Sequence, residues 1–173
     1  MVVPVGDGVI IAGVYKGFRD LMMAGLIEKL PRLVCVQAES SDAIHHYVTT
    51  GEYRAAAAPR TVADSISVSA PSNAHMARRA IAESDGFSIT VSDAEILEAQ
   101  AMLARTTGIF AEPAAAAGAA GLKKSAGIFG RGDRVVLLVT GHGLKDIDAP
   151  LRNIEVPAPI NPSRSPSVTL SWS

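Results

Sequence analysis

The sequence has very little of three things: cysteine, aromatic residues and excess charge of one sign. The single cysteine, Cys35, excludes an internal disulfide framework and every multi-cysteine metal site. Aromatic residues make up 5% of the chain, and the formal net charge is −1. Because Lys and Arg are spread along the chain, there is no basic patch for nucleic acid or for an anionic membrane surface. We therefore expect a small-molecule ligand, with no metal, nucleic acid or membrane partner.

Long apolar runs are also missing. No window approaches the roughly 18 uninterrupted apolar residues of a membrane span, and Met1 is followed by Val-Val-Pro-Val-Gly instead of a basic region and an apolar signal core. These absences predict a cytoplasmic location. Hydrophobic residues are 48% of the 173 residues, and a domain of this length buries roughly 70% of the surface that its unfolded chain exposes.

What the chain does have is an alternation of strand and helix patterns. Apolar and β-branched runs typical of strands buried in a parallel sheet occur at residues 2–5, 32–38, 87–91 and 134–140. Apolar residues at helical spacing occur near residues 9–29, 72–84, 93–105 and 113–125. The third of these segments begins with a capping-box pattern at Ser92 and Glu95. The predicted fold class is α/β, a mainly parallel twisted sheet flanked by helices.

The composition changes near residue 154. Proline and serine dominate from there, and little periodicity is left. We therefore divide the chain into a sheet-containing domain at residues 1–153 and a Pro/Ser-rich tail at 154–173, which we expect to be poorly ordered.

Glycines connect the first predicted strand to the first predicted helix. Gly6-Asp7-Gly8-Val9-Ile10 lets backbone N–H groups approach an anion at the positive end of that helix. A plain tight turn explains the same glycines. The third glycine of a dinucleotide fingerprint is absent, and so is the Gly-Lys-Ser/Thr of a Walker loop.

Two further segments carry candidate site residues. Thr140 ends the last predicted strand, where open α/β sheets place their ligands, and its hydroxyl could face a ring nitrogen; an ordinary strand end followed by a glycine turn is the alternative. Glu112 precedes Pro113 at the start of a helix, where an acidic residue is also favoured by the helix dipole. His142 follows Thr140 closely, so it either contacts the ligand or packs in the turn.

Several of these segments resemble the threonine synthases, in that family's order and at its approximate spacing. They are PVGDG with the following KGF (residues 4–18), LPRLVCVQAE (30–39), TVADSI (61–66), VSDAEILEA (91–99), GIFAEPAAAA (108–117) and VVLLVTGHGLKD (135–146). The resemblance extends from residue 1 to about residue 150. The phosphate loop and the VTGHGLKD motif together are specific for this family, whereas either one alone would not be.

The resemblance implies the fold, the cofactor and the reaction. Threonine synthases use pyridoxal 5'-phosphate to convert O-phosphohomoserine to threonine and phosphate, and this chain resembles the carboxy-terminal part of the large domain of that tryptophan-synthase-like fold. Residues implied to bind the cofactor are Gly6, Asp7, Gly8, Val9 and Ile10 around its phosphate, Thr140 at the pyridine nitrogen and Glu112 near the ring. A hydroxyl partner leaves that nitrogen largely unprotonated, which suits elimination and replacement chemistry.

The family's Schiff-base lysine has no match in this chain. In the family it lies upstream of the phosphate loop, in a Ser-x-Lys-Asp motif, and we therefore assign no catalytic residue here. We expect the chain to be catalytically incomplete alone, as a fragment or as one half of a split enzyme, and to form a homodimer or to associate with the missing amino-terminal half. Two alternatives stay open: part of a related dehydratase or β-replacement enzyme, and a non-catalytic module for phosphometabolite binding or dimerisation.

Overall fold

The structure is a computed structural model that describes residues 1–151 and 157–159. Its centre is a parallel sheet of three strands in the order β1-β2-β3. These strands are β1 (Val2–Pro4), β2 (Val34–Ala38) and β3 (Phe87–Val91). In register, Val2 lies opposite Val34, and Val34 lies opposite Phe87. The predicted α/β class with a parallel sheet is confirmed.

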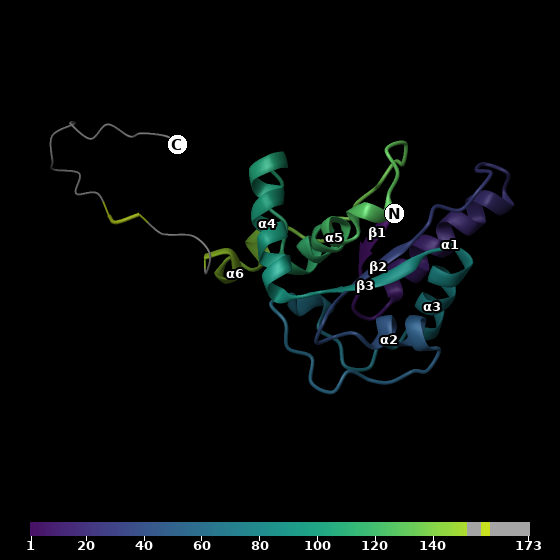
Figure 1. The fold of residues 1–173 in the computed structure, drawn as a ribbon, viewed down its shortest axis with the longest axis horizontal. Coiled ribbons are helices and arrows are strands. Elements are labelled where there is room, and N and C mark those ends of the chain that lie inside the picture. The colour runs from purple at the N-terminus through teal and green to yellow at the C-terminus, as the bar shows by residue number, and fades with distance from the viewer. Residues whose placement is uncertain (152–156, 160–173) are drawn as a thin grey trace.

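Helices cover both faces of this sheet (Figure 1). One face packs against α1 (Val9–Met23), α2 (Ala43–Thr50) and α3 (Ala74–Glu83) through a core that includes Val3, Val5 and Cys35. The other face packs against α4 (Asp93–Thr107) and α5 (Pro113–Lys124) through a core that includes Val2 and Val36. Successive strand residues point to opposite faces, so each strand contributes to both cores.

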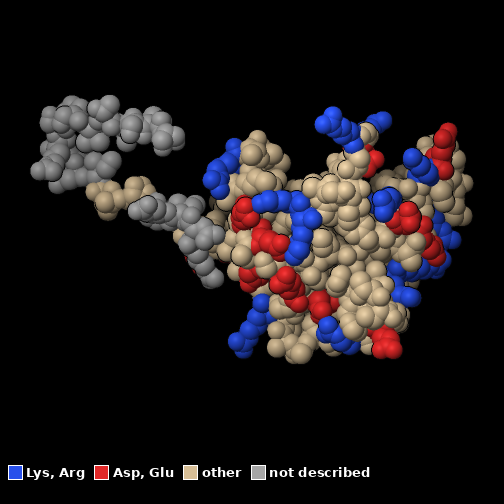
Figure 2. Space-filling view, viewed as in Figure 1, with Lys and Arg blue, Asp and Glu red and all other residues tan. Residues whose placement is uncertain are grey.

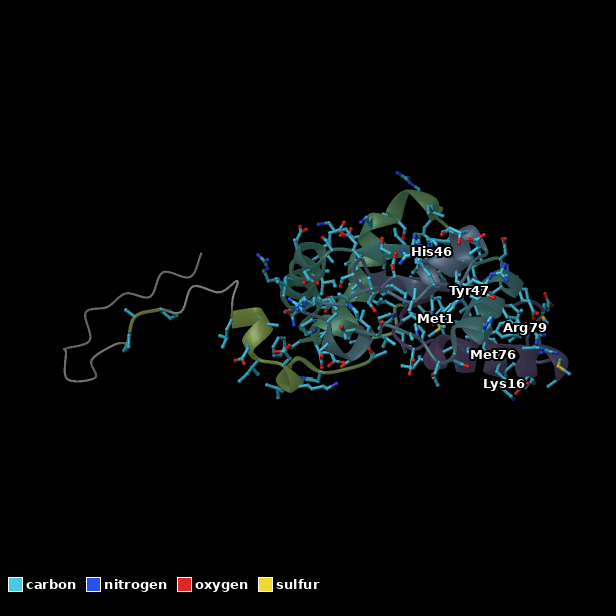
Figure 3. The ribbon with its side chains drawn as sticks, turned by 90° about the horizontal axis from the view of Figure 1, so that it is seen from below. Met1, Lys16, His46, Tyr47, Met76 and Arg79 are labelled. Carbon is cyan, nitrogen blue, oxygen red and sulfur yellow. The ribbon has the colours of Figure 1, made fainter. Side chains whose placement is uncertain are left out.

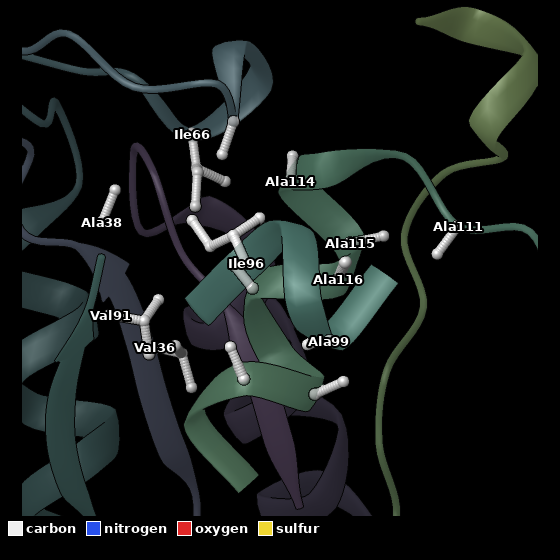
Figure 4. Packing of buried hydrophobic residues seen from close by; sticks show 14 of the residues in the cluster. Val36, Ala38, Ile66, Val91, Ile96, Ala99, Ala111, Ala114, Ala115 and Ala116 are labelled. Atoms are coloured by element: carbon white, nitrogen blue, oxygen red, sulfur yellow. The ribbon is translucent and has the colours of Figure 1, made fainter. Parts of the chain in front are cut away.

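Helix α5 packs closely against the sheet because it is made almost entirely of small residues. Every residue from Pro113 to Gly121 is buried, and all of these nine except Pro113 are alanine or glycine. A Cβ added at Gly121 would lie 2.4 Å from a methyl carbon of Val36, on the central strand. Figure 4 shows Ala114, Ala115 and Ala116 of α5 near Val36 and Ile96 in this core.

The first turn of α4 forms the capping box that the sequence predicted. The Glu95 amide donates to the Ser92 hydroxyl at 3.3 Å, and the Ser92 amide donates to the Glu95 carboxylate at 2.7 Å. Burial alone would raise the pKa of Glu95, but hydrogen bonds from the Ser92 amide and from Lys124 lower it below its usual value. A carboxylate with a lowered pKa stabilises the fold above its unfolded pKa, and this contribution is lost as the pH falls through its folded pKa.

Removing the cap should cost measurable stability. In Ser92→Ala we expect the free energy of unfolding to fall by about 1 kcal/mol, because the Glu95 amide loses its acceptor at the helix start. Urea unfolding followed by circular dichroism at neutral pH measures the loss. Ser72→Ala, at an exposed serine outside the capping box, is the matched control and should change the free energy by less than about 0.5 kcal/mol. Equal losses in both variants would contradict the assigned role of Ser92.

Residues 134–140 do not form the predicted fourth strand. Only Leu137 bridges to the sheet, in parallel with Val2. The Val2 amide donates to the Val136 carbonyl at 2.8 Å, and the Leu138 amide donates to the Val2 carbonyl at 3.0 Å. The segment therefore runs along β1 with too few paired residues for a regular strand. Within the described residues, no strand pairs with the edge of the 134–140 segment that faces away from β1.

Other boundaries also differ from the sequence predictions. Helix α1 ends at Met23 instead of near residue 29, because Gly25 has a φ of +71° and the Leu26 amide turns back to the Leu21 carbonyl. Helix α2 was not predicted, and it ends at Gly51, which has a φ of +82°. The short helices at Asp64–Ile66, Ala126–Ile128, Gly143–Lys145 and α6 (Asp148–Leu151) were not predicted either. The predicted disorder of the 154–173 tail concerns residues that are mostly outside the described ones.

The surface shows mixed charge. On the face in Figure 2, basic and acidic side chains are interspersed. Figure 3 shows the helical layer of α1, α2 and α3 with Lys16 on α1, His46 and Tyr47 on α2, and Met76 and Arg79 on α3.

Among the residues described, no helix is long and apolar enough to cross a membrane, and no group of three His, Cys, Asp or Glu side chains could hold a metal ion. Cys35 is fully buried, and burial raises the pKa of its thiol.

Candidate functional site

A pocket of about 380 Å³ lies at the carboxyl ends of the parallel strands. Its wall is formed by the loop after β1, the short helix Asp64–Ile66, the start of α5 and the end of the 134–140 segment. The pocket brings together all seven residues that the sequence singled out. They are Gly6, Asp7, Gly8, Val9, Ile10, Glu112 and Thr140. This is the edge at which open α/β sheets bind ligands.

The conformation of Gly8 shapes the loop after β1. Gly8 is the residue before α1, with a φ of +86° that disfavours any residue with a Cβ. A Cβ at this position would also lie 2.9 Å from the Cβ of Ala77 and 3.1 Å from a methyl carbon of Ile44. Glycine is therefore required here both by the backbone angle and by the close packing against α2 and α3.

Asp7 has a structural contact that its sequence context did not reveal. Its carboxylate accepts a hydrogen bond from the Ser72 amide at 2.9 Å, and its carbonyl accepts one from the Asn73 amide at 3.2 Å. The Asp7 side chain therefore ties the loop to the start of α3.

The backbone amides at the start of α1 are available to a ligand. In the described part of the chain, no protein group accepts a hydrogen bond from the amides of Gly8, Val9 or Ile10. The first amides of a helix have no acceptor within the helix, and they lie at the positive end of its dipole. This donor set suits a phosphate group, which accepts several hydrogen bonds and carries negative charge.

Glu112 is held tightly at the opposite wall. It is 6% exposed, and it precedes Pro113, which occupies the first helical position of α5. Its amide donates to the Gly141 carbonyl at 3.0 Å, and the Gly143 amide donates to the Phe110 carbonyl at 2.8 Å. A Cβ at Gly141 would lie 2.1 Å from a Glu112 carboxylate oxygen, so any larger residue there would displace the Glu112 side chain. These contacts fix the position of Thr140, the residue before Gly141.

Two pocket residues were not identified from the sequence. Lys145 donates from Nζ to the Ser65 hydroxyl at 2.7 Å and lies 3.3 Å from a Glu112 carboxylate oxygen. Both Lys145 and Ser65 line the pocket. The short helix Gly143–Lys145 turns the chain back toward the pocket. A helix of three residues is too short to leave a periodic pattern in the sequence. His142 is not among the pocket residues: its Nδ1 accepts from the Leu144 amide at 3.1 Å within the turn.

A larger cavity lies at the opposite end of the sheet. It has a volume of about 770 Å³, and its wall includes Met1, Arg32, Phe87 and Arg134. These residues are at the amino ends of the strands and of the 134–140 segment, and among the described residues the cavity wall includes no first residue of a helix. The smaller pocket combines free amides, a buried carboxylate, a hydroxyl and an ammonium group, so we consider it the candidate functional site.

A family comparison accounts for this combination. Residues 1–141 match the family model described as pyridoxal-phosphate dependent enzyme. The chain belongs to this family. Its members use pyridoxal phosphate, so the predicted cofactor class is confirmed. The free backbone amides at the start of α1 are hydrogen-bond donors of the kind that the phosphate group of that cofactor requires.

Curated relatives narrow the resemblance to one kind of enzyme. The chain is 42% identical over 167 residues to the threonine synthase of Methanocaldococcus jannaschii, covering 92% of this chain and 40% of that protein. It is 43% identical over 150 residues to the threonine synthase of Methanosarcina acetivorans, covering 84% of this chain and 37% of that protein. The chain thus spans about two fifths of the length of these relatives. The predicted similarity to threonine synthases is confirmed.

Solved structures support the fold. The threonine synthase of Escherichia coli superposes with a TM-score of 0.66 at 20% identity, covering 91% of this chain and 36% of that one. An L-serine ammonia-lyase from Rhizomucor miehei gives a TM-score of 0.65 at 24% identity, covering 80% of this chain and 44% of that one. At these identities the likeness shows the fold alone. Which residues of the family pocket bind the cofactor in this chain stays a prediction.

Proposed function

We propose that this chain forms the cofactor-phosphate half of the active site of a threonine-synthase-like enzyme, which converts O-phosphohomoserine to threonine and phosphate. The observation that supports the proposal best is the single pocket shared by the free amides of residues 8–10, Glu112 and Thr140. We choose the substrate because the chain is up to 43% identical to threonine synthases.

Each residue has a defined part in this proposal. The amides of Gly8, Val9 and Ile10 hold the cofactor phosphate at the start of α1. The Thr140 hydroxyl would donate a hydrogen bond to the pyridine nitrogen, and because a neutral hydroxyl, unlike a carboxylate, does not stabilise a pyridinium cation, the nitrogen would stay largely unprotonated. Glu112 stands at the wall of the pocket beside the ring. When bound, pyridoxal phosphate supplies an electron sink for a carbanion next to the substrate amino group.

We propose that the lysine that transfers the proton in this reaction is not among the described residues of this chain. Among the lysines of the described chain, Lys145 alone lines the pocket, and its ammonium is already engaged by Ser65 and Glu112. Lys16, Lys123 and Lys124 form ion pairs on the surface, and Lys29 lies at the larger cavity at the opposite end of the sheet. We therefore propose that the 173-residue chain alone is catalytically incomplete.

Ligand titration tests the phosphate-binding role. We expect pyridoxal phosphate and inorganic phosphate to shift the amide resonances of Gly8, Val9 and Ile10, because these amides lack protein acceptors. Each hydrogen bond contributes only about 1 kcal/mol net, so binding should be loose. Pyridoxal, which lacks the phosphate, is the matched control ligand and should leave these resonances in place. Equal shifts with pyridoxal would contradict the assignment of this loop to the phosphate.

The same sample tests catalytic incompleteness. No phosphate should be released from O-phosphohomoserine, and borohydride treatment with pyridoxal phosphate should label no single lysine stoichiometrically. Stoichiometric labelling of Lys145 together with turnover would show instead that this chain carries its own catalytic lysine.

A further inference from the structure

The ammonium group of Lys145 joins two walls of the pocket. It contacts the Ser65 hydroxyl at 2.7 Å and the Glu112 carboxylate at 3.3 Å, and Ser65 itself lies 3.5 Å from the same carboxylate oxygen. Ser65 belongs to the short helix Asp64–Ile66, and Glu112 precedes α5. The three side chains therefore form one cluster at the mouth of the candidate site, and the cofactor roles assigned above use only Glu112.

The charges around the pocket are poorly balanced without Lys145. The charged residues of the pocket wall are Asp7, Glu112 and Lys145, so Lys145 is the single cation among the described residues that line it. The Asp7 carboxylate is directed to the Ser72 amide. Glu112 as a residue is 6% exposed, so its carboxylate has little contact with solvent and would repel a phosphate bound in the same pocket.

Lys145 combines a fixed position with free donor capacity. An ammonium group has three N–H donors; one donates to the Ser65 hydroxyl, and even with a second given to the ion pair with Glu112 a third is left. The Lys145 side chain is 63% exposed, whereas Glu112 is buried. The third donor is therefore available to a ligand, and the carboxylate and the hydroxyl limit where the ammonium can lie.

We propose that Lys145 is a further phosphate-binding residue of this pocket, held in place by Glu112 and Ser65. The inference rests on the proposed function, because it assigns a cation to the phosphate that the amides at the start of α1 bind. The ligand class is a phosphate monoester or free phosphate. The Lys145–Glu112 pair is neutral as a whole, so the carboxylate no longer excludes the anion and the ammonium still donates to it.

Replacing Lys145 by methionine tests the proposal. We expect Lys145→Met to weaken the binding of both pyridoxal phosphate and inorganic phosphate by about tenfold, the usual effect of losing one charge-assisted hydrogen bond. Titrations followed by the amide resonances of residues 8–10 measure this change. Lys145→Arg, which keeps the charge, should retain most of the affinity, and Lys29→Met, at the far end of the sheet, should retain all of it. Added salt should weaken the wild type more than Lys145→Met.

A double variant separates direct binding from simple neutralisation of Glu112. If Lys145 contacts the phosphate, Lys145→Met remains about tenfold weaker even in a Glu112→Gln background. Recovery of the Glu112→Gln affinity in the double variant would overturn the proposal, and so would a Lys145→Met affinity within twofold of the wild type. A wild-type chain that binds neither ligand would overturn the proposed function as well.

Competition identifies which phosphate Lys145 serves. If pyridoxal phosphate displaces inorganic phosphate, the cofactor phosphate occupies the Lys145 site. If both bind together, a second phosphate group lies beside the cofactor. Either result supports the proposal if the Lys145→Met substitution weakens the binding of that phosphate.

Discussion

Phosphate binding is expected to be lost in a Gly8→Val variant. Valine strongly disfavours the φ of +86° at this position, and its Cβ would lie 2.9 Å from the Cβ of Ala77. The loop must then move, and the amides of Val9 and Ile10 move with it. We expect the affinity for pyridoxal phosphate and inorganic phosphate to fall by more than tenfold, because several convergent donors are displaced together. Isothermal titration or the amide resonances measure the loss.

Gly25→Val provides the matched control. Gly25 also has a positive φ, of +71°, but an added Cβ there has no atom within 4 Å, and Gly25 lies beyond the far end of α1. This variant should lose stability from backbone strain and keep the phosphate affinity of the wild type. Equal losses of affinity in both variants would show that global stability, rather than the loop conformation, controls binding.

Replacing Gly121 by valine should destabilise the fold by about 3 kcal/mol, since overpacked core positions typically cost 1–3 kcal/mol and sometimes more. The added Cβ would lie 2.4 Å and 2.7 Å from the two methyl carbons of Val36. Val36 is fully buried on the central strand, so neither side chain can turn away. Helix α5 would have to move off the sheet. Urea unfolding followed by circular dichroism measures the change.

Gly13→Val is the control for Gly121→Val. Gly13 also lies within a helix, α1, but an added Cβ there has no atom within 4 Å. Its free energy of unfolding should change by less than about 0.5 kcal/mol. A small effect at Gly121 would contradict the close approach of α5 to β2.

The sequence predicted those elements whose local signals agree with their packing. Strand β3 was predicted with its exact bounds, Phe87–Val91, because Gly86 and the capping box at Ser92 delimit it. Helix α1 was predicted too long because Leu26 continues its apolar spacing, while Gly25 already ends the helix. Helix α2 was missed, although Gly51 marks its end.

The rest depends on contacts that are distant in the sequence. The run at residues 134–140 has a strand composition, but the number of paired residues depends on its neighbours, and only Val2 pairs with it. In the pocket, the strand-end rule identified Thr140 and the glycine pattern identified the loop. Lys145 and Ser65 are 80 residues apart in the chain, and no local pattern relates them.

The sparse pairing of residues 134–140 has a consequence for when the pocket exists as a whole. Free energies of local opening differ across a protein, and segments with few backbone hydrogen bonds open first. The Gly8 loop follows β1, which is paired with β2, whereas Thr140 follows a segment that two hydrogen bonds to Val2 hold against the sheet. The 134–140 segment thus separates from β1 at a lower energetic cost than β1 from β2, while the hydrogen bond from the Glu112 amide to the Gly141 carbonyl still ties its end to α5. A ligand that contacts both walls would bring the exchange protection of the 134–140 amides closer to that of the sheet.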